Sequence, residues 1–306
     1  MSELVSSPYC PGLLPGLHSP LYAALARGEF DARGLRVRFL EPVARTERLA
    51  RLRSGEADIA LLDLASLVDT VAVEPAFAAR CVFVLDRHLP MAAIFVHDRP
   101  APLRPIQSPR DLLYARYGGE ATSSFVQEHR ALLRRLGGDD SKPHIEMPYA
   151  ALFDALAVGE IDVAPDYAGI LPTYQRAAGP DQRVRVLPYR DCGVSAYGTG
   201  LVASGRALQE QRDAIGAFLS VTASAYRAMR ADPGGTLDAA GAVLPQLDTE
   251  YALMEWREQE GPSIFSGGDR LGHSDRSGWE QTIAWRREVV CLPDPPEPDR
   301  LMETLA

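Results

Sequence analysis

The stretch GEADIALLD at residues 55–63 recurs in altered form as GEIDVAPD at residues 159–166. Each copy follows a segment with leucines near its end. Each predicts the same local structure: a glycine that ends a helix, an acidic turn, and an apolar strand that finishes in an aspartate. A chance match of glycine stops and acidic turns is the alternative explanation. Two α/β lobes of similar build would produce this repeat, and 306 residues are enough for two such lobes.

The segments around these copies continue the α/β pattern. Residues 19–28 predict a short helix that Ser19 caps, with Pro20 at the first helical position and Gly28 as a left-handed stop. Residues 35–39 alternate apolar and polar side chains, which indicates a strand with one buried face. After a glycine-containing loop at residues 117–125, we expect a further helix.

Charge and composition exclude several classes of partner. The net charge is −9, whereas a nucleic-acid-binding protein needs a basic stripe. No apolar run reaches the roughly 18–20 residues that span a bilayer, so we expect no membrane insertion. Lys142 is the single lysine and lies in a polar turn, so we expect no lysine-bound pyridoxal phosphate. Because no His, Asp and Glu stand at metal-ligand spacing, we expect neither a metal nor another cofactor.

Five short motifs follow one another along the chain: HSPLYAA at 18–24, GEAD at 55–58, SPRDL at 108–112, GEID at 159–162 and GLVAS at 200–204. In this order and spacing the chain resembles the nitrate, sulfonate and thiamine-pyrimidine-precursor branch of the ABC-transporter substrate-binding proteins. The resemblance implies an α/β, two-lobed type II periplasmic-binding-protein fold with two hinge crossings and an inter-lobe cleft. That cleft would hold a small anionic or heteroaromatic ligand. Residues 1–90 plus 198–306 would form lobe 1, and residues 91–197 lobe 2.

Three adjacent hydroxyl residues, Thr122, Ser123 and Ser124, are the first candidates for contact with such a ligand. They precede a predicted helix, so their hydroxyls and the free N–H groups of the helix start can receive a phosphate, sulfonate or carboxylate. The alternative is that one of them only caps the helix. Both roles are compatible.

Five further residues are candidate ligand contacts, each with a structural alternative. His18 borders the ligand in the resembled family, and the alternative is a buried histidine bonded to the backbone. Asp63 and Asp166 end the two equivalent strands. They could accept a hydrogen bond from a ring nitrogen or an amine, or could cap the next helix. Tyr167 and Tyr197 could stack on a flat ligand, or could pack in the core or hinge.

Cys10 raises the alternative of an enzyme. Residues 9–11, Tyr-Cys-Pro, are similar to the nucleophile region of the aromatic sulfinate desulfinases, which share this fold. Only His18 is near enough in sequence to lower the pKa of that thiol. The histidine and arginine of those enzymes have no clear counterpart at residues 59–68, and a packed bystander thiol is the other interpretation. The cysteine-rich motif of the fungal pyrimidine-forming enzymes of this fold is absent.

Three functions therefore remain open. The first is a carrier that binds a small molecule for an ABC permease. The second is a cytoplasmic enzyme that acts on a small aromatic, carboxylated or sulfinated substrate, with Cys10 and His18 as catalytic residues. The third is a cytoplasmic ligand-sensing or chaperoning module. The first ten residues contain no basic and apolar leader, so the sequence as it stands predicts a cytoplasmic location, whereas a carrier requires a leader and export. The order of the motifs favours the carrier.

Overall fold

The computed structural model describes residues 2–7, 15–97, 105–139, 144–259, 263–266, 270–292 and 294–305. The chain forms two compact units. Unit 1 comprises residues 1–88, 196–286 and 292–306, and unit 2 comprises residues 89–195 and 287–291. Unit 1 is therefore built from both ends of the chain.

A five-stranded sheet forms the centre of unit 1, in the order β2-β1-β3-β10-β4. Its strands are β1 (Ser2–Ser7), β2 (Leu35–Phe39), β3 (Ile59–Asp63), β4 (Arg80–Val84) and β10 (Thr199–Ala203). β1 pairs in parallel with β2 and β3. β10 comes from the returning chain and runs antiparallel between β3 and β4, with Thr199 opposite Asp63. The predicted alternating strand at residues 35–39 is confirmed.

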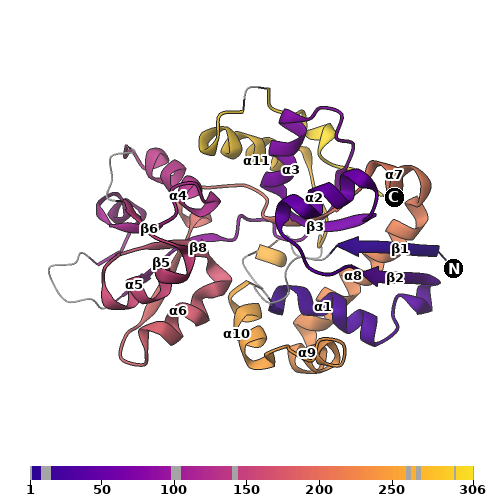
Figure 1. The fold of residues 1–306 in the computed structure, drawn as a ribbon, viewed down its shortest axis with the longest axis horizontal. Helices are drawn as coiled ribbons and strands as arrows, with labels where there is room; N and C mark the ends of the chain where they lie inside the picture. The colour runs from indigo at the N-terminus through magenta and orange to yellow at the C-terminus, as the bar shows by residue number, and fades with distance from the viewer. Residues whose placement is uncertain are drawn as a thin grey trace. The chain divides into compact units, whose positions relative to one another are not determined.

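Helices cover both faces of this sheet, which explains why the first four residues of β3 are all buried. They are α1 (Pro15–Ala26), α2 (Arg45–Ser54), α3 (Leu64–Val73), α7 (Gly205–Glu210), α8 (Arg212–Ala231), α9 (Pro233–Gly241), α10 (Thr249–Gln259) and α11 (Arg276–Val289). In Figure 1, α2 and α3 lie on one side of the sheet, and α1, α9 and α10 on the other. One apolar core joins β3 and α3 to Trp279 and Ile283 of α11.

The two predicted turns of the repeat have the same geometry. Gly55 and Gly159 end their helices with φ of 75° and 82°, a region that favours glycine. Asp58 then accepts a hydrogen bond from the Val5 N–H over 2.9 Å. Asp162 accepts the Arg116 N–H over 2.8 Å. Each aspartate thus ties its turn to a segment next to the following strand.

The start of α1 differs from the prediction. The helix begins at Pro15, and the Ser19 hydroxyl donates to the Pro15 carbonyl oxygen over 2.6 Å. Ser19 therefore lies inside the helix, and its predicted role as cap is wrong. Pro20 is also internal, so its predicted first position is wrong as well. Gly28 does adopt the predicted left-handed conformation, with φ of 68°.

Unit 2 contains a three-stranded sheet in the order β8-β5-β9 and a pair of parallel strands, β6 and β7. The strands are β5 (Met91–Val96), β6 (Tyr117–Gly119), β7 (His144–Glu146), β8 (Ala164–Tyr167) and β9 (Val184–Pro188). Three helices pack around them: α4 (Ser124–Arg135), α5 (Leu152–Val158) and α6 (Leu171–Ala178). β5 pairs antiparallel with both β8 and β9. β8 also contacts α4, with Tyr167 at the end of β8 against Phe125 at the start of α4.

Candidate functional site

The amino end of α4 carries the predicted hydroxyl run. Ser123 is the N-cap, and its side-chain oxygen accepts the Val126 N–H over 3.3 Å. Ser123 is half-buried, whereas Thr122 and Ser124 are exposed. One residue earlier, the Ala121 N–H donates to both carboxylate oxygens of Glu146, over 3.2 and 3.1 Å. This loop therefore already holds one acidic group on its backbone, as the partial positive charge of a helix start favours.

Three half-buried aromatic rings adjoin the hydroxyl run; we call Phe125, Tyr149 and Tyr167 the aromatic face. Phe125 stacks on Tyr149 with ring centres 5.9 Å apart and an interplanar angle of 22°. The edge of Phe125 meets Tyr167 at 5.0 Å and 79°. Because Phe125 directly follows Ser124, unit 2 presents hydroxyls and flat rings side by side. Phe125 and Tyr149 escaped the sequence prediction; Tyr149 comes from a separate segment and joins the hydroxyl run only through the fold.

Asp166 lies behind the aromatic face and is completely buried. Its carboxylate accepts the Tyr167 N–H over 2.8 Å and the Tyr174 hydroxyl over 2.9 Å, and it also bonds to the Tyr149 side chain. Burial raises its pKa to about 6, against the lowering effect of these hydrogen bonds. Asp166 thus holds two residues of the aromatic face in place from within the unit. A direct bond from Asp166 to a ligand stays a prediction.

His18 and Asp63 lie in unit 1. His18 is buried in α1, where burial and then the charge of Arg48 lower its pKa to about 3. An imidazole with this pKa is neutral at pH 7 and would not supply positive charge to a neighbouring thiol. Asp63 is the N-cap of α3 and accepts the Ser66 N–H over 2.9 Å. Cys10 and Lys142 lie outside the described residues.

Tyr197 packs inside unit 1. Its hydroxyl accepts the Asp275 N–H over 3.1 Å, and its ring meets Trp279 edge-on with ring centres 5.4 Å apart. The guanidinium carbon of Arg87 lies 5.7 Å from the ring centre. The structure therefore brings Thr122, Ser123, Ser124, Asp166 and Tyr167 together in unit 2, and places His18, Asp63 and Tyr197 in unit 1.

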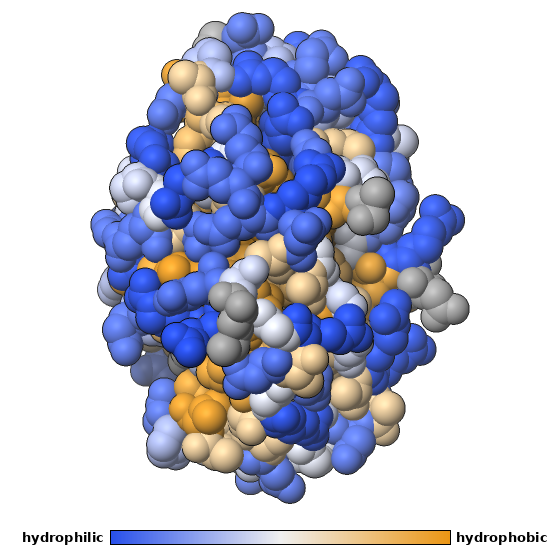
Figure 2. Space-filling view, turned by 90° about the vertical axis from the view of Figure 1, so that its right-hand side faces the viewer, coloured by the Kyte–Doolittle hydropathy of each residue, from blue (hydrophilic) through white to orange (hydrophobic). Residues whose placement is uncertain are grey.

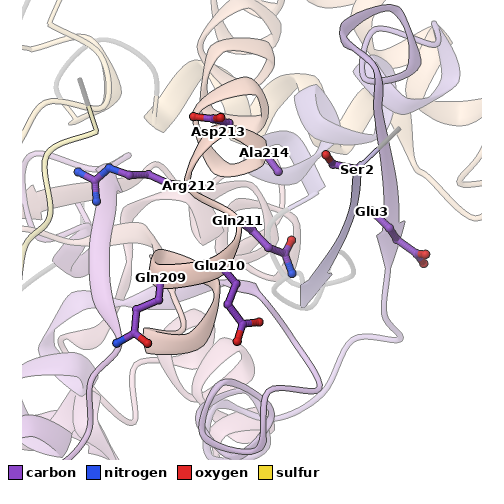
Figure 3. Close-up of a pocket in the computed structure, with 8 residues that line it drawn as sticks. All are labelled: Ser2, Glu3, Gln209, Glu210, Gln211, Arg212, Asp213 and Ala214. Atoms are coloured by element: carbon purple, nitrogen blue, oxygen red, sulfur yellow. The ribbon is translucent and has the colours of Figure 1, made fainter.

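A surface pocket of unit 1 has a different character. Its volume is about 490 Å³, and Figure 3 shows that the junction of α7 and α8 and the start of β1 form its walls. Arg212 points away from Ser2 and Glu3 in that view, and it pairs with Glu303 over 2.9 Å. With Glu3, Glu210 and Asp213 also in the lining, the pocket is unsuited to an anion.

The surface offers no extended apolar patch among the exposed large hydrophobic side chains of the described segments, which are Val73, Tyr114, Val158 and Val243. The face drawn in Figure 2 is mostly hydrophilic, with apolar residues in small groups. None of the described helices is long and apolar enough to cross a bilayer. Within the same part of the chain, no three His, Cys, Asp or Glu residues are grouped to hold a metal ion.

Comparison with known proteins gives the same fold. A family model described as "NMT1/THI5 like" matches residues 16–236. The periplasmic aliphatic sulphonate binding protein SsuA from Escherichia coli superimposes with a TM-score of 0.76 at 15% identity, over 100% of this chain and 93% of that one. SsuA from Xanthomonas axonopodis, an alkanesulfonate-binding protein bound to MOPS, gives a TM-score of 0.67 at 15% identity, over 98% of each chain.

The ligand-binding component of an ABC-type import system from Staphylococcus aureus, with zinc bound, gives a TM-score of 0.69 at 12% identity. The superposition covers 99% of this chain and 97% of that one. No curated protein sequence matches the chain. These likenesses confirm the α/β periplasmic-binding-protein fold that the sequence predicted.

Proposed function

This chain belongs to the NMT1/THI5-like family, and from that premise we propose that it is a substrate-binding protein that captures a small molecule and releases it unchanged. One observation carries the proposal: the amino end of α4 presents Thr122, Ser123 and Ser124 beside three half-buried rings. A surface of hydroxyls, helix N–H groups and flat rings suits recognition without chemistry.

The ligand we propose is small and carries an acidic group, a flat ring, or both. The acidic group would lie at the start of α4, where the N–H groups of the first turn and the Ser124 hydroxyl can donate to it. A ring would lie against Phe125 and Tyr167, whose exposed parts offer apolar contact. Two similar structures are sulfonate-binding proteins, which supports an oxyanion such as a sulfonate.

The partner we propose is an ABC permease that takes over the captured molecule. The Staphylococcus aureus protein of the same fold is the ligand-binding component of an ABC-type import system. Work with such a permease requires a location outside the cytoplasm. Fractionation of cells that express the native gene, followed by detection of the protein outside the cytoplasm, would support this partner; a purely cytoplasmic protein would contradict it.

Native mass spectrometry of the purified protein tests the proposal most directly. We expect a retained small molecule that leaves on mild activation. Its mass should be the same before and after a cycle of release and rebinding. Calorimetry with that molecule then gives its affinity. Catalytic turnover of the retained molecule into a product of different mass would contradict a carrier and favour an enzyme.

A further inference from the structure

The amino end of α1 is already occupied by a side chain of the same unit. Oε2 of Glu255, in α10, accepts the Leu17 N–H over 3.0 Å, and the Gly16 N–H bonds to the same carboxyl group. α10 packs beside α1 (Figure 1). These two N–H groups belong to the first turn of α1, and N–H groups of a first turn have no partner within their own helix. A helix of 12 residues thus begins on an acidic group supplied from 238 residues away.

Gly16 makes this contact geometrically possible. A Cβ atom at this position would stand 2.3 Å from Oε2 of Glu255 and 2.4 Å from the carbonyl oxygen of Ala252. Real Cβ atoms do not approach other atoms so closely. The glycine therefore leaves a cradle at the start of α1 that the Glu255 carboxyl group fills.

The second oxygen of this carboxyl group points to a use beyond capping. Oε1 of Glu255 is buried and has no hydrogen-bond partner among the described residues. Burial raises the pKa of Glu255 to about 8, the N–H groups of Leu17 and Gly16 lower it, and the charge of Asp86 raises it. The Tyr226 hydroxyl, whose pKa is raised by burial and by the charges of Asp86 and Glu255, donates to the Leu17 carbonyl oxygen over 2.7 Å. A cap needs only one side-chain oxygen, so the buried Oε1 of Glu255 is left over in the interior of the unit.

We propose that the amino end of α1 is an acid-binding position that Glu255 fills from within, and that Glu255 is thereby a specificity-determining residue. It keeps the carboxylate or sulfonate of a small molecule off the start of α1, which leaves the start of α4 as the position that receives an acidic group of the ligand. The effect of Glu255 on ligand specificity rests on the proposed function. The filled acid position stands on the contacts of Glu255 alone.

Rescue by a small acid tests the filled position. Glu255→Ala removes a carboxyl group and one further carbon, a space that formate or acetate can occupy on the freed N–H groups. We expect Glu255→Ala to melt at a lower temperature than the wild type. Formate at constant ionic strength should then raise its Tm in a saturable way, by about 4 °C at a 100-fold excess over its Kd. Glu255→Gln, which keeps an oxygen on both N–H groups, and the wild type should show no such rise.

Two controls keep the result decisive. Chloride at equal ionic strength controls for a general effect of salt on stability, which would raise the Tm of the wild type as well. If Glu255→Ala does not fold, Glu255→Asp, whose carboxyl group is one methylene shorter, is titrated in the same way. Absence of a formate effect in the folded variant, or an equal effect in the wild type, would overturn the inference. A ligand that binds through Ser123 and Ser124 would still support the proposed function in that case. Formate rescue without any retained ligand would support the filled position and not the function.

Discussion

Tyr174 donates its hydroxyl to Oδ2 of Asp166 over 2.9 Å, and both side chains are buried in unit 2. Replacement of Asp166 by alanine would leave this hydroxyl buried without an acceptor, so we expect the free energy of unfolding to fall by about 1–3 kcal/mol. Asp166→Asn keeps an acceptor and should cost less. Denaturant unfolding measures both variants.

The matched control for Asp166 is Tyr174→Phe, which removes the donor as well. The double variant Asp166→Ala with Tyr174→Phe should lose less than the two single losses added together, because the Tyr174 hydroxyl is no longer present to be left unpaired. Strict additivity of the two losses would show that the pair does not act as a unit.

Ser123 and Ser124 should contribute to ligand binding in unit 2. If they donate to a charged group, the double alanine variant should weaken binding of the retained ligand by about 1–3 kcal/mol in calorimetry. Ser123→Ala alone should also lower the free energy of unfolding by about 1 kcal/mol, because Ser123 caps α4. Exposed Ser220 of α8 provides a matched serine-to-alanine control. Unchanged affinity in the double variant would remove the site.

Glu255 should make stability depend on pH. Its pKa in the folded protein is about 8, above the ordinary value of 4.5, so the folded state binds the proton more tightly than the unfolded state. The stabilisation is complete below pH 4.5 and is lost as the pH rises through 8. Glu255→Gln has no titrating group at this position. Its free energy of unfolding should therefore increase relative to that of the wild type as the pH rises from 5 to 9. Parallel pH profiles of the two proteins would contradict the assignment.

Gly16→Ala should disturb the junction of α1 and α10. The added Cβ would collide with Oε2 of Glu255 and with backbone of α10, so we expect a loss of at least about 1–3 kcal/mol of stability. Gly216 in α8 is the control, since a Cβ there meets no atom within 4 Å. Gly216→Ala should stabilise the protein by about 0.5–1 kcal/mol. Equal effects of the two substitutions in thermal unfolding would argue against the cradle.

The thiol of Cys10 should react as an ordinary cysteine if the protein is a carrier. The rate of iodoacetamide labelling at Cys10 should then rise only near the pKa of a free thiol, about 8.5. His18→Ala should leave this pH dependence unchanged, because His18 is neutral. Burial raises the pKa of Cys81 and Cys192 to about 12, and exposed Cys291 is replaced by serine beforehand. A labelling phase near neutral pH that disappears in His18→Ala would favour the enzyme.

Local signals predicted the parts of this protein that neighbouring residues determine. The glycine stops at Gly55 and Gly159 and the cap at Ser123 each depend on a few adjacent residues, and the structure contains all three. The start of α1 was misplaced because Ser19-Pro20 is typical of a helix start, whereas Glu255 supplies the first turn of this helix from far along the chain. An acid inside a helix, as Glu255 is, gives no sequence signal of such a contact. The prediction of the site was incomplete for the same reason, because Tyr149 joins the site only through the fold.

Because β10 lies between β3 and β4, the sheet of unit 1 can be completed only late in synthesis. A nascent chain that has emerged only to His88 contains β1 to β4 but not the strand that lies between two of them. β3 and β4 then expose unpaired N–H and C=O groups until residues 199–203 leave the ribosome, more than a hundred residues later. Chains halted within unit 2 are therefore expected to be prone to aggregation, and the gap favours the protection of these strand edges by a chaperone during translation.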